Sequence, residues 1–223
     1  MSFIHEPIDL GYDDLATESV DGKRVYVTPE GIRFPSVTTV LSINTKDAII
    51  EWRRRVGPEE ANRKSSFAAS RGTQVHKMVE RYLDNRDDYL EKSNHLTRHN
   101  FNVMKPTLDE RISKIVLQEA PLYSKHLGIA GRVDCIGVFD GKLSVIDFKT
   151  AEKPKRWDWI HNYFMQETAY AIAFEERTGI PIVDLITIIV NDIDNEPQVF
   201  HEKRDHWVNP LLDTIARYRG LTD

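Results

Sequence analysis

A short apolar run, Val145-Ile146-Asp147-Phe148-Lys149-Thr150, carries the feature that most constrains this chain. Its β-branched and aromatic residues predict a strand. Because side chains alternate between the two faces of a strand, Asp147 and Lys149 share one side with Leu143 and Val145. Burying an acid and an amine in a sheet is costly unless they pair or bind something. The fold must therefore accommodate a charged pair, either as a structural ion pair or as part of a functional site.

A second acid lies in a neighbouring apolar run. Asp134 ends the segment Gly131-Arg132-Val133-Asp134, and Asp140-Gly141 between the two runs is a strong signal for a tight hairpin. Two carboxylates and a lysine on adjacent strands are the groups needed to hold a divalent metal beside a phosphate and to activate water. The pattern therefore favours a metal-dependent nuclease.

Composition excludes several other classes of protein. A single cysteine, Cys135, rules out a disulfide framework and a four-cysteine zinc or iron–sulfur site within the chain, and we expect this thiol in the core. No run approaches the length of a transmembrane helix, so no membrane partner is expected. Residues 1–14 hold four acids and no Lys or Arg, unlike an Arg-rich mitochondrial presequence, and they contain no secretory hydrophobic segment. We expect a cytoplasmic protein of a bacterial or phage-infected cell.

The distribution of charge matters more than the formal net charge of −5. The two ends of the chain are acidic. Residues 46–77, in contrast, hold eight Lys or Arg against four acids, and residues 142–156 hold five against two. A local basic groove on an acidic protein is enough to collect a phosphate backbone. The alternative is that these runs are solvated helix faces, which we favour for Arg53-Arg54-Arg55 alone.

The pattern of turns and apolar positions predicts one α/β domain over residues 1–223. Residues 1–114 contain a hairpin and a helical part, and residues 115–223 contain the catalytic sheet, a helix, and the C-terminal strands and helix. The expected strands cover residues 24–27, 32–34, 115–117, 129–139, 143–150, 184–190 and 198–203. The expected helices cover residues 36–41, 47–56, 58–83, 96–114 (broken or kinked at Pro106), 157–177 and 206–218.

Four motifs follow one another along the chain in a characteristic order. They are Gly-Thr-x-x-His at 72–76, Gly-x-Val-Asp at 131–134, Asp-x-Lys at 147–149 and Gln-x-x-x-Tyr at 166–170. This series resembles the RecB-type nucleases of the PD-(D/E)xK superfamily. The segments Phe34–Leu41 and Asp147–Lys155 extend the resemblance to the mitochondrial genome maintenance exonuclease family and its phage and bacterial relatives. The resemblance implies a restriction-endonuclease-like core, in which helices flank a mixed central sheet, with a helical N-terminal elaboration.

The resemblance also implies roles for individual residues. Asp134 and Asp147 would be the central metal ligands, joined by His76 and the backbone carbonyl of Phe148. Lys149 would orient and polarise the attacking water. Further residues would complete the site: Gln166 and Tyr170 would shape it and contact substrate, Ser70 and Arg71 would clamp a phosphate, and Glu119 is the candidate for the early acidic motif. A plain surface acid is an equally acceptable interpretation of Glu119, and His76 alone would be an ordinary helix histidine. Relatives with an iron–sulfur cluster use four cysteines, which excludes that cofactor here.

The segment after the third strand mixes bases with aromatics. Lys153, Lys155 and Arg156 precede Trp157 and Trp159. Bases combined with aromatic rings suit single-stranded DNA, because every nucleobase has a face on which to stack. In the alternative interpretation both tryptophans begin a buried helix, and we assign stacking to at most one of them. We expect Trp52 in the core.

The expected activity is that of a DNA exonuclease that acts on single-stranded or free-ended DNA in replication, recombination or end processing. Oxygen-rich ligands favour Mg²⁺ or Mn²⁺, and a histidine ligand suits Mn²⁺. Three alternatives stay open: a structure-specific endonuclease of the same fold, a non-catalytic DNA-binding subunit, and a general hydrolase. The intact Asp134, Asp147 and Lys149 count against the non-catalytic subunit.

Overall fold

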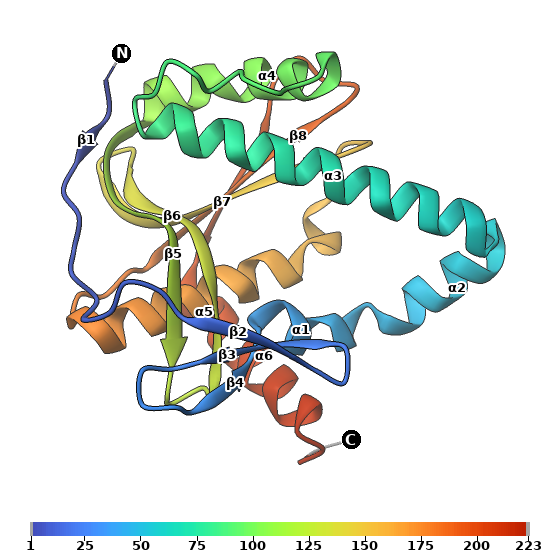
Figure 1. The fold of residues 1–223 in the computed structure, drawn as a ribbon, viewed down its shortest axis with the longest axis vertical. Coiled ribbons are helices and arrows are strands. Elements are labelled where there is room, and N and C mark those ends of the chain that lie inside the picture. Colours follow the sequence, from blue (N-terminus) through green and yellow to red (C-terminus); the bar gives the residue numbers. More distant parts are fainter. Residues whose placement is uncertain (1, 222–223) are drawn as a thin grey trace.

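The computed structural model describes residues 2–221, and within them six strands form one central mixed sheet (Figure 1). Its order is β1-β5-β6-β7-β8-β9. The strands are β1 (Ile4–His5), β5 (Ile112–Ser124), β6 (Ile129–Phe139), β7 (Lys142–Ala151), β8 (Asp184–Asn191) and β9 (Gln198–Lys203). β5, β6 and β7 pair antiparallel, whereas β8 runs parallel to β7. A parallel neighbour requires a crossover, and the helix that follows β7 supplies it.

Helices cover both faces of this sheet, as Figure 1 shows. The helices are α1 (Val37–Leu41), α2 (Lys46–Val56), α3 (Pro58–Leu83), α4 (His95–Arg111), α5 (His161–Thr178) and α6 (Arg204–Tyr218). Apolar residues of α3 and α4 pack with Ile146 and Phe148 of β7 into one core. Those of α1, α5 and α6 pack with Val145 into a second core on the opposite face. The alternation expected along β7 is therefore confirmed, as is the flanked mixed sheet.

A smaller sheet carries the N-terminal part of the chain. Within the described residues it contains β2 (Ala16–Val20), β3 (Lys23–Val27) and β4 (Arg33–Pro35), all antiparallel. The Ser36 hydroxyl then caps α1 by accepting a hydrogen bond from the Thr39 amide. A bridge between Ser36 and Ala130 ties this junction to β6. The predicted hairpin and the short helix after it are confirmed, whereas β1 and β2 were not predicted.

Three predictions about the elements were wrong. β5 is much longer than the predicted strand at 115–117. α4 is not broken at Pro106, one of the two outcomes predicted there, because both Pro106 and Asn102, whose carbonyl loses its partner, are exposed to water. Trp52 is only half-buried, and α2 contributes no residue to either core; α2 and the first part of α3 extend beyond the sheet (Figure 1).

None of the helices in residues 2–221 is long and apolar enough to cross a membrane.

Candidate active site

Asp147 and Lys149 form an ion pair on the α5 side of β7. The Asp147 side chain is 2% exposed and that of Lys149 is 19% exposed, so the pair is largely out of water. Gln166 of α5 donates from Nε2 to Asp147 Oδ1 at 3.2 Å. Burial raises the pKa of Asp147, and the Lys149 ammonium opposes that rise. Burial alone would lower the pKa of Lys149, but the carboxylates of Asp147 and Asp134 raise it. Lys149 therefore stays a cation, held in place by Asp147.

Asp134 lies where the ladder between β6 and β7 ends. The last backbone pair joins Cys135 to Ile146, so Asp134 and Asp147 occupy opposite positions just beyond it. The Phe148 amide there donates to Asp134 Oδ2 at 3.0 Å, in place of a backbone partner on β6. The acid thus terminates the ladder and remains held between the two strands. Cys135, its neighbour, is fully buried as predicted.

Glu119 completes a row of acids across three strands. Gln118 pairs with Cys135 and Ala120 pairs with Val133, which puts Glu119 opposite Asp134. Glu119 has a φ of +45°, in the left-handed region that non-glycine residues rarely adopt. In a regular strand Gln118 and Ala120 would share one face of the sheet. Here they lie on different faces, since Gln118 hydrogen-bonds to the α3 backbone whereas Ala120 packs in the core that contains α5. The irregularity aims the acid toward α3.

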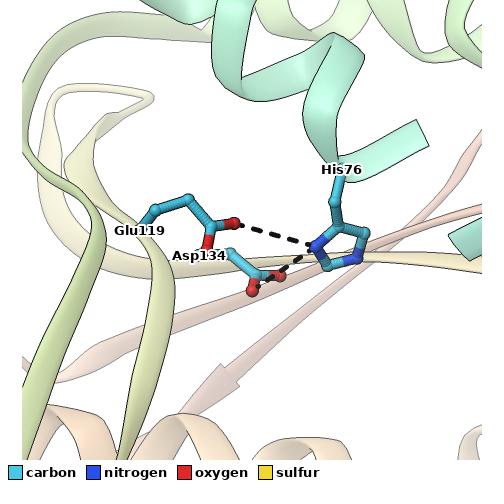
Figure 2. A group of neighbouring side chains, drawn as sticks. All are labelled: His76, Glu119 and Asp134. Carbon is cyan, nitrogen blue, oxygen red and sulfur yellow. Dashed lines mark ion pairs between the residues drawn. The ribbon is translucent and has the colours of Figure 1, made fainter. Parts of the chain in front are cut away.

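His76 of α3 meets these acids from above the sheet (Figure 2). Its Nδ1 lies 3.6 Å from Asp134 Oδ1 and 4.0 Å from Glu119 Oε1. One donor atom from each of the three residues lies within 4.8 Å of the others. The structure therefore brings together His76, Asp134 and Glu119, while Asp147 lies with Lys149. No contact places the Phe148 carbonyl in this group; its amide faces Asp134 instead.

The donor set fits a hard divalent cation. Two carboxylates and one imidazole nitrogen converge on a small cavity that is also lined by Glu80 and Gln118. Burial, reinforced by the Asp134 carboxylate, raises the pKa of Glu119 to about 7. Such crowding of acids is unfavourable without a positive charge between them, and a bound cation would relieve it.

Gln166 and Tyr170 lie one turn apart on α5, on the side that faces the strands. Tyr170 is buried, and a Cβ added at Gly131 would stand 2.7 Å from its hydroxyl oxygen. Glycine in the Gly-x-Val-Asp motif is therefore the residue that allows the tyrosine to pack against β6. Tyr170 supports the strand that carries Asp134, whereas Gln166 touches Asp147 directly.

Glu167 is a residue of this region that the sequence analysis missed. It is fully buried on α5 and accepts a hydrogen bond from the Thr187 hydroxyl. Thr187 is the β8 partner of Asp147, so Glu167 lies close to the β7 residues of the candidate site. Burial and the Asp147 carboxylate raise its pKa well above the usual range, which keeps it neutral. The sequence does contain a signal for Glu167, because this acid follows Gln166 on the side of the predicted amphipathic helix that carries its apolar residues.

The expected phosphate clamp has a partner within the chain. Arg71 is 6% exposed and pairs with Asp192 at 2.5 Å, while Ser70 accepts from Gln74 at the surface. A pocket next to Arg71 has a volume of about 500 Å³. It is lined by Trp52, Arg63, Lys64, Phe67, Lys155 and Asp192, among others.

The two tryptophans after β7 differ in their surroundings. Trp157 donates its indole N–H to Glu202 at 2.7 Å and packs against His161 and Trp207, although 47% of the residue is exposed. Trp159 is 64% exposed, with the Arg156 guanidinium 5.4 Å from its ring. Trp159 is therefore the more exposed of the two rings, whereas Trp157, which was predicted to contact DNA, is partly engaged by packing and by its hydrogen bond. Lys155 lines the pocket beside Arg71, and Lys153 lies in the same exposed segment.

Several known proteins are similar to this chain. The model of the PD-(D/E)XK nuclease superfamily matches residues 51–217. Mitochondrial genome maintenance exonuclease 1 of Homo sapiens is 28% identical over 156 residues, which cover 65% of this chain and 45% of that protein. Its counterpart in Mus musculus is 29% identical over 129 residues, 54% of this chain and 38% of that protein. The chain thus matches less than half the length of these relatives. The crystal structure of SSO0001 superposes with a TM-score of 0.39 at 16% identity, over 68% of this chain and 75% of that one.

Proposed function

Because the chain belongs to the PD-(D/E)XK nuclease superfamily, we propose that it is a metal-dependent exonuclease that hydrolyses single-stranded or free-ended DNA. Mammalian proteins similar to it are named as exonucleases that maintain the mitochondrial genome. A role in replication, recombination or end processing is consistent with that likeness. The cytoplasmic location stays a prediction from the sequence.

The observation that carries this proposal is the convergence of the motif residues from distant segments. His76 of α3, Glu119 of β5 and Asp134 of β6 form a cation-binding set, and the Asp147–Lys149 pair lies directly across from Asp134. When bound, Mg²⁺ or Mn²⁺ would polarise the scissile phosphate and lower the pKa of a coordinated water. The imidazole donor favours tolerance of Mn²⁺.

The remaining chemistry belongs to the chain itself. The Lys149 ammonium is fixed by Asp147 and by packing 5.0 Å from the centre of the Tyr163 ring. A cation in this place can orient an attacking water and offset the charge that builds on the phosphate oxygens. Gln166 keeps Asp147 in position. The single-stranded substrate is supported by the basic pocket, in which 55% of Phe67 is exposed beside Arg63 and Lys155.

Degradation of matched linear and circular single-stranded DNA tests the proposal. We expect loss of the linear form only, in Mn²⁺ or Mg²⁺ and not in chelator. Lys149→Ala should lower the rate by roughly 10²- to 10⁴-fold while DNA binding is kept. Lys142→Ala, at the exposed start of the same strand, is the matched control and should cut normally.

Other outcomes would change the assignment. Cleavage of the circle would make the protein an endonuclease, and binding without cleavage under any metal would make it a DNA-binding subunit. Full activity of Lys149→Ala would refute the role of the acid–lysine pair.

A further inference from the structure

The pocket beside Arg71 lies at the carboxyl end of β7, next to the candidate active site. Thr150 follows Lys149 and lines this pocket. A Cβ added at Gly72 would lie 3.8 Å from the Thr150 hydroxyl, so α3 crosses β7 at this point. Arg71 precedes His76 by five residues on α3, about 7.5 Å along the helix axis at 1.5 Å per residue. The pocket is thus placed for a phosphate next to the scissile one.

The Arg71 guanidinium is only partly used. Its Nη1 contacts Asp192 Oδ2 at 2.5 Å, and its Nε is buried with no hydrogen-bond partner among residues 2–221. The Phe67 ring centre lies 5.9 Å from the guanidinium carbon. Arginine commonly binds carboxylates and phosphates through two parallel N–H donors. A single-point contact leaves donors available for a ligand with more oxygens.

Asp192 is not held by a tight network. Its other oxygen, Oδ1, accepts from the Asn100 amide at a long 3.4 Å. The Asn100 Oδ1 atom is itself buried and has no partner in the described part of the chain. The Asp192 side chain is 25% exposed, follows β8 and lines the pocket. The carboxylate is therefore partly open to solvent, and an incoming phosphate that pairs with Arg71 would compensate for the loss of its contact.

We propose that Arg71 is a phosphate clamp for the DNA backbone and that Asp192 occupies it in the free protein as an intramolecular competitor. A backbone phosphate then displaces the Asp192 carboxylate from the guanidinium and takes its place. This proposal rests on the function proposed above and adds an intramolecular contact, between Arg71 and Asp192, that weakens DNA binding. It predicts that Asp192 raises KM and leaves kcat unchanged, because the chemistry takes place at Asp134, Asp147 and Lys149.

Removing the competitor tests the idea. Asp192→Asn keeps the shape of the side chain and removes its charge. Fluorescence anisotropy with labelled oligo(dT) in chelator measures binding without cleavage, and steady-state cleavage in Mn²⁺ gives KM and kcat. We expect the Kd and KM of Asp192→Asn to fall roughly tenfold to a hundredfold with kcat constant, as suits a charged hydrogen bond. Glu196→Gln, an exposed acid four residues further on, removes the same charge and is the matched control.

A double variant separates the clamp from a general charge effect. Arg71→Gln should weaken binding, and adding Asp192→Asn to it should bring no further gain, since the carboxylate then has no clamp to block. Equal effects of Asp192→Asn and Glu196→Gln would overturn the proposal. So would a gain that persists without Arg71. If Asp192→Asn does not fold, Asp192→Ser takes its place in the same cycle. A wild-type protein that neither binds nor cuts DNA would instead refute the proposed function.

Discussion

Glu119→Gln should stabilise the metal-free protein, and much more at neutral and alkaline pH than at acidic pH. In the fold, burial and the Asp134 carboxylate raise the pKa of Glu119 from 4.5 to about 7. The folded state therefore holds this proton more tightly than the unfolded state does. The cost to stability is absent below about pH 4.5, grows as the pH rises, and levels off above about pH 7.

The magnitude follows from the size of the rise. At 1.36 kcal/mol per pKa unit, the full penalty is about 3 kcal/mol. The Glu119 side chain is 29% exposed, so solvent screening reduces that figure and we expect about 1–3 kcal/mol. Glutamine carries no charge at any pH, so the variant escapes the penalty. For a chain of this size the gain corresponds to a rise in Tm of about 2–10 °C at pH 8, and to about a quarter of that rise at pH 5.

Thermal unfolding at pH 5 and pH 8 in chelator measures this difference between Glu119→Gln and wild type. Glu110→Gln, an exposed acid at the end of α4, is the control and should show no pH-dependent gain. Adding Mn²⁺ should reverse the order at pH 8, because the cation stabilises the wild-type set of ligands more than the variant set. A Glu119→Gln protein that is less stable than wild type at pH 8 without metal, or equally shifted at both pH values, would refute the reasoning.

Two further substitutions test the packing behind the site. Gly131→Ala should lower the free energy of unfolding in urea by about 1–3 kcal/mol, because its Cβ would meet the buried Tyr170 at 2.7 Å. Gly72→Ala, where the nearest side chain is 3.8 Å away, should be neutral or stabilising. A larger loss for Gly72→Ala than for Gly131→Ala would contradict this account of the packing. Glu167→Leu should lower the free energy of unfolding by about 1–3 kcal/mol, because Thr187 loses its acceptor. Glu167→Gln should lower it by less than about 1 kcal/mol, because the native acid is neutral. Equal losses of the two variants in urea unfolding would show that Glu167 is charged in the fold.

The sequence could predict the site residues that regular strands and helices position. Asp147 and Lys149 alternate with apolar neighbours, so their shared face followed from strand geometry alone. His76 was found through its spacing from Gly72 in a motif. Arg71 was also predicted to bind a phosphate, but its partner Asp192 is 121 residues away in sequence. No local sequence pattern predicts a contact between residues so far apart, because the contact depends on how the turn after β8 packs against α3.

What the sequence could not predict is the irregularity at Glu119. Periodicity assumes regular backbone, and the left-handed residue in β5 breaks the alternation at the point where an acid must turn toward α3. Backbone strain of this kind costs about 1–3 kcal/mol and persists only where surrounding structure enforces it. Here the long antiparallel pairing of β5 with β6 holds it on both sides. Glu119 also has the raised pKa, so backbone strain and the crowding of negative charge coincide at one candidate ligand. A regular strand would leave Glu119 away from His76, and the cation-binding set would lose one of its two carboxylates.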